Sequence, residues 1–274
     1  MWRRGEAEPW TRDGRVRADI VQVAPDVAGL VTEVLVRDNA VVRKGQVLFV
    51  LDPSRYELAL AQAEAALATS RAVLAQARRE DQRNKALGPD LAPLETVEQG
   101  AAKVEQLEAA LRQAIAARNL AALNLERTRV VAPVDGVISN TEMRPGEYLA
   151  AGHPAMALVY TGSLHVDGYF EETKLPAVRV GDRARVELMG VAEPIQGHVE
   201  SIAGGVEDRE RGASSTMLAN INPTFSWVRL PQRIPVRIAI DHVPAGVRLI
   251  PGSTATVVVQ PRIAQPLAPR SLIW

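Results

Sequence analysis

The alternation of apolar and polar positions divides the chain into β-rich stretches on either side of a long helical stretch. Residues 20–52 are rich in valine and leucine, and glycines and short polar pairs interrupt them, which is typical of short strands joined by turns. Residues 130–159 have the same texture, and further strand-like stretches follow from about residue 163. The pattern predicts a mainly β protein with a helical insertion.

The first helix is predicted to begin after Asp52 and Pro53. Ser54, with Glu57 three residues later, has the spacing of a capping box. Residues 55–87 are rich in alanine and contain neither Gly nor Pro, which favours a helix. One residue in every seven, and the residue three positions later, form a coiled-coil-like seam: Leu60, Leu67 and Leu74, with Ala63, Ser70 and Ala77.

A second helix is predicted over about 94–128, because Gly88-Pro89 stops the first helix and Pro93 precedes the next. The period of seven returns here: Val97, Val104, Leu111, Arg118 and Leu125, with Leu107, Ala114 and Ala121. Two long helices with a short connection form an antiparallel hairpin, with arms about 50 Å long. Their alanine-rich faces leave little apolar surface for a third helix, so we expect the hairpin to project rather than pack inside a bundle.

The two β-rich stretches that flank the helices repeat one another. Gly29 and Gly45 are sixteen residues apart, and so are Gly136 and Gly152. We expect these glycines to mark the structural turns of two half-motifs. When the two stretches are aligned on them, the predicted turns of one stretch coincide with those of the other. Each half buries a core only when it pairs with the other. The base of the hairpin would then close as the halves meet.

The C-terminal part, from 163 to 260, contains several short strand patterns and predicts a small barrel or sandwich. Pro231 and Pro235 interrupt one of these patterns and suggest edge strands or bends. The tail that follows is rich in proline and we expect it to be loosely held.

Composition and motifs exclude several classes of function. The formal net charge is +0, and arginine pairs alternate with acidic residues, so we expect no nucleic-acid partner. The chain has no cysteine and its four histidines are scattered, so we expect no metal site. Neither a nucleophile elbow nor a phosphate-binding loop is present, so we expect no enzyme activity and no cofactor.

Several ordered motifs resemble the periplasmic adaptor family, also called membrane fusion proteins of the HlyD type. They are PWTRDGRV (9–16), VAPDVAGLVTEVLVRDNAVVRKGQVLFVLD (23–52), ERTRVVAPVDGVI (126–138), PGEYL (145–149), EETKLPAVRVGDRARVEL (171–188) and WVRLPQRIPVRI (227–238). The first and last look most similar to the branch that serves aromatic carboxylic acid (p-hydroxybenzoic acid) efflux pumps, with EmrA-type adaptors next.

The resemblance implies a domain plan. An N-terminal segment (1–19) would precede a lipoyl-like β-sandwich, or barrel-sandwich hybrid, built from 20–53 and 129–160. An α-helical coiled-coil hairpin (54–128) would split the sandwich, and a β-barrel domain (161–262) and a flexible tail (263–274) would follow.

The resemblance also implies partners and a location. The chain would join an inner-membrane transporter to an outer-membrane channel, and would associate with itself as a trimer or hexamer. It would act at the periplasmic face of the inner membrane, with the family's membrane anchor missing from this chain.

The hairpin tip would then dock on the channel. Drug-pump adaptors carry an Arg-x3-Leu-x6-Ser pattern there, and Arg83 and Leu87 keep the first spacing. Leu94 stands in the serine position, so the mode of docking is open. Arg83, Leu87 and Leu91 are the candidate contacts. The competing interpretation makes Arg83 a solvated charge and Leu87 a seam residue.

Two rival functions use the same fold. A swinging-arm carrier needs a modifiable lysine where the halves join, but that junction is the hairpin, and Lys44 lies within the first half. A cell-envelope module that binds a ligand or metal would need clustered Met or His, and these residues are dispersed. We therefore favour the adaptor.

Overall fold

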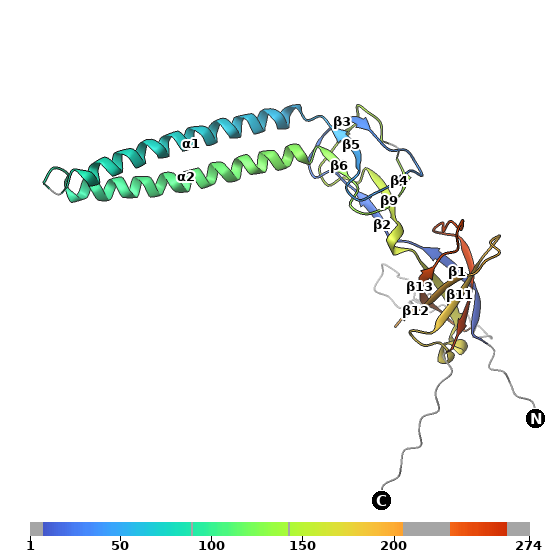
Figure 1. Ribbon diagram of the computed structural model, residues 1–274. Coiled ribbons are helices and arrows are strands. Elements are labelled where there is room, and N and C mark those ends of the chain that lie inside the picture. Colours follow the sequence, from blue (N-terminus) through green and yellow to red (C-terminus); the bar gives the residue numbers. More distant parts are fainter. Residues whose placement is uncertain (1–7, 89, 142, 205–230, 262–274) are drawn as a thin grey trace, which may run out of the picture. The chain divides into compact units, whose positions relative to one another are not determined.

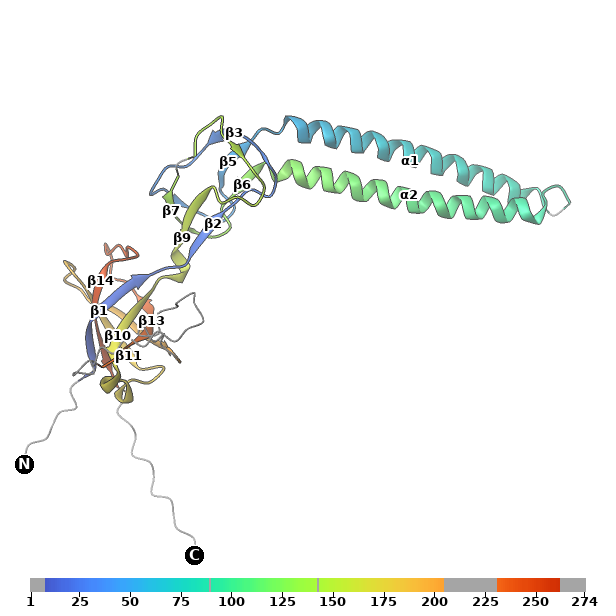
Figure 2. The same ribbon diagram turned by 180° about the vertical axis from the view of Figure 1, so that it is seen from behind.

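The computed structural model describes residues 8–88, 90–141, 143–204 and 231–261. The tail 263–274 and the first four residues of the stretch 227–238 lie outside the described residues. The chain forms two compact units, one of Ile20–Val159 and the other of Met1–Asp19 with Tyr160–Trp274. Figures 1 and 2 show the first unit with its two long helices and the second with its strands.

The first unit contains a sandwich of two sheets. One sheet has the order β2-β9-β7-β4 and the other β6-β5-β3-β8. Both sheets draw strands from before and after the hairpin, so the core forms only when the halves pair. The strands are β2 (Ile20–Val23), β3 (Gly29–Val34), β4 (Val41–Val42), β5 (Val47–Leu51), β6 (Arg129–Val131), β7 (Gly136–Asn140), β8 (Tyr148–Leu149) and β9 (Met156–Tyr160).

The backbone hydrogen bonds of the sandwich repeat when the two halves are exchanged. Gly45 N donates to Ala132 O at 2.8 Å, and its counterpart Gly152 N donates to Pro25 O at 2.8 Å. The strand pairs follow the same exchange: Val41↔Val137 and Val42↔Gly136 in one sheet correspond to Tyr148↔Leu30 and Leu149↔Gly29 in the other. The sequence repeat is therefore a structural pseudo-two-fold.

Two of the four glycines of the repeat lie at turns, and the other two lie at the starts of strands. Gly45 and Gly152 lie at turns with φ of 85° and 75°, a conformation that favours glycine. Gly29 and Gly136 instead begin β3 and β7, so the expectation of a turn there is wrong. At Gly136 the reason for glycine is a close approach, since a Cβ would come 2.2 Å from Val159 O.

The sandwich core consists of aliphatic side chains from both halves, with one phenylalanine. The buried members are Val23, Val27, Val31, Val36, Val42, Leu48, Phe49, Leu51, Val130, Ala132, Ile138, Met143, Leu149, Met156 and Leu158. Neighbouring residues of a strand face opposite sides of the sheet, so even a strand of two residues places one side chain in this core.

Helices α1 (Ser54–Ala86) and α2 (Leu94–Glu126) are each 33 residues long and run side by side in opposite directions (Figure 1). The predicted capping box at Ser54 does not form. Ser54 is already the first helical residue, and its hydroxyl and backbone N–H both donate to Asp52 Oδ1, at 2.6 and 3.0 Å. Asp52 therefore supplies the acceptor at this helix start.

The second unit is a closed barrel with the order β1-β10-β13-β12-β11-β14. Its strands are β1 (Trp10–Arg17), β10 (His165–Glu171), β11 (Arg183–Leu188), β12 (Ile195–Ile202), β13 (Arg233–His242) and β14 (Thr254–Gln260), with short 3₁₀ helices η1 (Thr161–Ser163) and η2 (Glu172–Ala177). Its core includes Val16, Val166, Phe170, Val186, Ile195, Val199, Ile238 and Val257.

Two expectations for this part are wrong. Residues 10–17 are not a separate N-terminal segment, because β1 pairs with both β10 and β14 and closes the barrel. Two of its buried positions, Thr11 and Gly14, are not apolar. The alternation of apolar and polar residues that predicts a strand is therefore weak here. Pro235 lies not on an edge strand but in β13, which has β10 on one side and β12 on the other.

Candidate functional site at the hairpin tip

The two helices meet along the seam that the period of seven predicts. Leu67 and Leu74 are buried in α1. The seam positions of α2 are half-buried throughout. Two ion pairs also join the helices: Arg78 Nη2 to Glu108 Oε1 at 2.7 Å, and Nη2 of the seam residue Arg118 to Glu64 Oε1 at 3.4 Å. Exposed pairs of this kind contribute little, so apolar packing holds the hairpin.

The seam continues toward the tip with a carboxylate that the sequence analysis missed. Asp81, seven residues after Leu74, is only 7% exposed. Its Oδ2 accepts from Lys85 Nζ at 2.6 Å, and its Oδ1 is buried and finds no donor among the described residues. Gly100 of α2 faces it, since a Cβ there would lie 3.2 Å from Asp81 Oδ1. Extending the seven-residue count one step beyond Leu74 would have found Asp81.

The three predicted contact residues lie in the last turns and the connection of the hairpin. Arg83 is exposed and forms no ion pair within the described part of the chain. Leu87 is 50% exposed and Leu91 is 74% exposed. Leu87 is therefore not a seam residue. Leu94, in the position of the family's serine, is 72% exposed and adds to the apolar surface.

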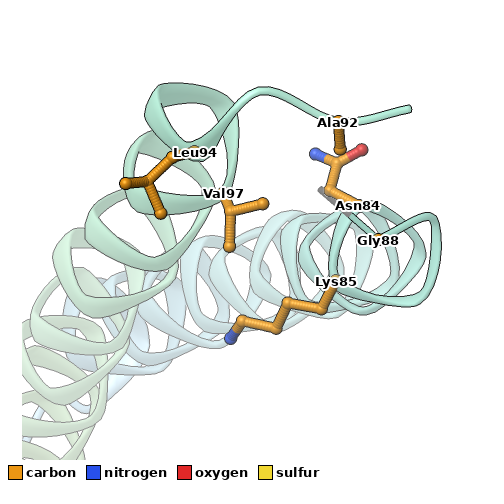
Figure 3. A pocket seen from close by; sticks show the side chains of 6 residues that line it. All are labelled: Asn84, Lys85, Gly88, Ala92, Leu94 and Val97. Carbon is orange, nitrogen blue, oxygen red and sulfur yellow. The ribbon is translucent and has the colours of Figure 1, made fainter. Parts of the chain in front are cut away.

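A recess of about 250 Å³ lies between the helix ends, and of these three leucines only Leu94 lines it. Its lining comes from the end of α1, the connection and the start of α2: Asn84, Lys85, Gly88, Ala92, Leu94 and Val97 (Figure 3). The walls are mainly apolar, and one amide and one ammonium group lie among them. Such a recess suits an apolar side chain of another protein better than a charged small molecule.

The base of the hairpin is tied to the loop that precedes β3. Tyr56 OH donates to Ala28 O at 2.5 Å, and the Arg55 guanidinium also donates to this carbonyl. A hydrogen bond from Arg55 to the Tyr56 hydroxyl, at 2.7 Å, raises the pKa of Arg55. Just after the end of α2, Arg127 Nη1 lies 3.5 Å from Asp26 Oδ2. Both strands of chain at the hairpin base therefore contact the first half-motif.

The described residues contain no group of three His, Cys, Asp or Glu side chains that could hold a metal ion. Among the helices of the described ranges, none is long and apolar enough to cross a membrane.

Two family models match the chain. The model of the barrel-sandwich hybrid domain of RND membrane fusion proteins matches residues 19–161, more than half of the chain. The model of the AAEA-like β-barrel domain matches residues 163–260. The matches adjoin and together cover the sandwich, the hairpin and all of the barrel except β1.

Solved structures of low identity share the fold. A putative efflux transporter from Bacteroides eggerthii has 22% identity and a TM-score of 0.67, over 94% of this chain and 70% of that one. A MacA–MexA chimera with the Pseudomonas aeruginosa MexA hairpin has 20% identity and a TM-score of 0.66, over 94% and 84%. The periplasmic adaptor EmrA has 20% identity and a TM-score of 0.51, over 92% and 98%.

Proposed function

Because the chain belongs to the membrane fusion protein family, whose members are periplasmic adaptors and not enzymes, we propose that it links an inner-membrane transporter to an outer-membrane channel in an efflux pump. The comparisons do not favour the alternative of a ligand- or metal-binding module with the same fold.

The observation that carries the proposal is the apolar tip of the hairpin. Leu87, Leu91 and Leu94 are each at least half exposed in a short segment, although leucines in the middle of α1 are buried. Several exposed apolar side chains in one short segment are typical of a protein–protein contact. A channel end that covered them would gain roughly 1.5–3 kcal/mol for each leucine fully buried.

The proposed cargo is an aromatic carboxylic acid. Two observations support it: the resemblance of PWTRDGRV and WVRLPQRIPVRI to the branch that exports such acids, and the match of the AAEA-like barrel model to residues 163–260. The adaptor would work as a trimer or hexamer at the periplasmic face of the inner membrane, held there by an anchor.

Site-specific photo-crosslinking tests the docking role. Photoreactive residues at positions 83, 87 and 91 of the membrane-anchored protein should capture an outer-membrane channel, identified by mass spectrometry. Position 35 is a matched control, because Leu35 is similarly exposed at 53% but lies in the sandwich. Capture of a channel from position 35 as efficiently as from the tip, or of no channel at all, would refute the proposal.

The cargo is tested separately. Cells that lack the chain should accumulate p-hydroxybenzoate, and the chain should restore export. Restoration of drug export without any effect on aromatic acids would refute the cargo while leaving the docking role intact.

A further inference from the structure

A tryptophan lies on the outside of the barrel, at the end where β1 begins and β14 ends. Trp10 is the first residue of β1, and its neighbour Pro9 accepts a hydrogen bond from Val259 N at 2.9 Å. Trp10 is 43% exposed, whereas Thr11, the next residue of the strand, is buried. The indole ring is therefore outside the barrel core.

Two cations lie over this indole ring. Cζ of Arg12 is 5.4 Å from the ring centroid, and Lys174 Nζ is 4.9 Å from it. Lys174, in η2, also donates to the backbone O of Trp10 at 3.2 Å. Arg12 is exposed and forms no ion pair with any residue that the structure describes. These contacts hold an aromatic ring and two positive charges together on the surface.

The same end of the barrel carries a further apolar and a further basic side chain. The turn between η2 and β11 lies at this end, because Arg183 at the start of β11 pairs with Gln260 at the end of β14. This turn presents Val180, which is 65% exposed, and the exposed Arg179. Figures 1 and 2 show η2 at the end of the barrel where β1 begins. The barrel-end surface is defined here as Trp10, Arg12, Lys174, Arg179 and Val180.

The acidic side chains at this end only partly offset its positive charge. Glu171 Oε2 lies 3.8 Å from Lys174 Nζ, and Glu172 is exposed. Asp182 is 3% exposed and accepts a hydrogen bond from Arg179 N at 2.8 Å, so this carboxylate is directed to the backbone of the turn. The basic side chains that remain are Arg12, Lys174, Arg179 and Arg183. The surplus of positive charge is small, so any partner must engage the ring as well as the charges.

We propose that the barrel-end surface contacts the phospholipid bilayer, with Trp10 among the headgroups and the basic side chains on the phosphates of anionic lipids. Tryptophan is enriched at membrane interfaces, because its ring is apolar and its N–H can donate a hydrogen bond. Each basic residue close to an anionic membrane surface strengthens binding roughly fivefold. Charged side chains lie beside both apolar ones, which suits the mixed chemistry of a headgroup layer better than a continuous apolar protein contact.

This inference deepens the proposed function and rests on it, because the proposed adaptor is held at the periplasmic face of the inner membrane. It assigns to the barrel a lipid contact that is separate from the docking residues at the hairpin tip. The contact orients the barrel on the bilayer in addition to any anchor.

Vesicle flotation tests the contact with the purified full chain and no other protein. The chain should float with vesicles of phosphatidylethanolamine and phosphatidylglycerol, and much less with vesicles of phosphatidylcholine alone. Trp10→Ala or Lys174→Glu should lower the bound fraction about fivefold or more, whereas Lys174→Arg keeps the charge and should retain binding. Thermal unfolding of each variant verifies that its barrel remains folded.

Two matched controls lie in the other unit of the chain. Lys103→Glu reverses an exposed charge on α2, and Leu35→Ala shortens a side chain of the sandwich that is 53% exposed. Neither variant should change the bound fraction, because neither position belongs to the barrel-end surface.

The fluorescence of Trp10 locates the ring directly once the other three tryptophans are replaced, in the variant Trp2→Phe/Trp227→Phe/Trp274→Phe. On anionic vesicles the emission of Trp10 should shift to shorter wavelength, and lipids with brominated acyl chains should quench it. Emission that vesicles neither shift nor quench would show that the ring does not enter the interface, and the proposal would be wrong.

The outcomes separate this inference from the proposed function. Flotation that Trp10→Ala and Lys174→Glu weaken, and that the two controls leave unchanged, supports the lipid contact. Flotation that these two variants leave unchanged, or no flotation while the hairpin tip still captures a channel, overturns the lipid contact and leaves the adaptor role standing. No flotation and no channel capture would overturn both.

Discussion

Asp81 and Gly100 lie against each other across the hairpin seam, and the absence of a side chain at Gly100 allows the carboxylate to be buried there. The missing side chain of Gly100 makes room for the carboxylate, since a Cβ there would come 3.2 Å from Asp81 Oδ1. A polar residue in an apolar seam fixes the register of a coiled coil at some cost in stability. Any shift of one helix would replace Gly100 by a larger residue opposite Asp81. This pair therefore sets the alignment of the tip.

Gly100→Val should destabilise the hairpin, although valine is a better helix former than glycine, because its branches would overlap Asp81. Overpacking of this kind costs roughly 1–3 kcal/mol. Thermal unfolding followed by helical circular dichroism measures the effect. Ala101→Val is the control, because Ala101 is exposed one residue further along the same helix. Equal losses in the two variants would contradict the seam contact.

Asp52 should titrate below its ordinary range, because the hydroxyl and the backbone N–H of Ser54 hydrogen-bond to its carboxylate and lower its pKa. The contribution of Asp52 to stability is then present above its unfolded pKa and is lost as pH falls through the lowered folded value.

An NMR titration of the Asp52 carboxyl measures this shift. Ser54→Ala should raise the pKa toward its ordinary value, whereas Ser54→Thr keeps a hydroxyl and should largely preserve the shift. Identical titration curves in all three proteins would show that the hydrogen bond does not operate in solution.

Gly136→Ala and Gly29→Ala should differ, although these glycines are equivalent in the repeat. At Gly136 a Cβ would lie 2.2 Å from Val159 O, a backbone atom that cannot move aside cheaply, whereas at Gly29 the nearest atom is 3.4 Å away. We expect a loss of about 2–4 kcal/mol for Gly136→Ala and under about 1 kcal/mol for Gly29→Ala. Chemical denaturation distinguishes the two, and a similar loss at both sites would refute the asymmetry.

Leu91→Asp should reduce recovery of the channel about tenfold or more, because a charge would have to lose its water at a contact that now buries a leucine. Co-purification with the channel measures the loss, and the melting temperature should not change because Leu91 is 74% exposed. Leu35→Asp, on an exposed sandwich position, should leave recovery intact. A loss caused equally by Leu35→Asp would assign the contact elsewhere.

Periodicity made much of the fold predictable. The seven-residue spacing through Leu67 and Leu74 identified the seam, and the equal spacing of the glycine pairs identified the pseudo-two-fold that the backbone hydrogen bonds now display. Both signals are regular spacings between residues, which can be measured along a single sequence. The capping box failed for a local reason, since Asp52 competes for the hydroxyl of Ser54.

The candidate site was less predictable. Arg83, Leu87 and Leu91 came from a family pattern and a count toward the turn, but whether Leu87 faces the seam or solvent depends on how the last turns pack. The burial of Asp81 is hard to predict because an aspartate is normally exposed, and only the bare backbone of Gly100 allows this one to be buried.

The order of the elements, the hairpin and the pairing of the two half-motifs can be predicted from the sequence, because strands and coiled coils have characteristic periods along the chain. The closure of the barrel by β1, the burial of Asp81 and the exposure of Leu87 are visible only in the folded molecule. Each of these depends on which surfaces meet between residues far apart in the chain. Position 14, for example, suits only glycine because the pairing of β1 with β14 would bring a Cβ there to 2.6 Å from Ala255 O.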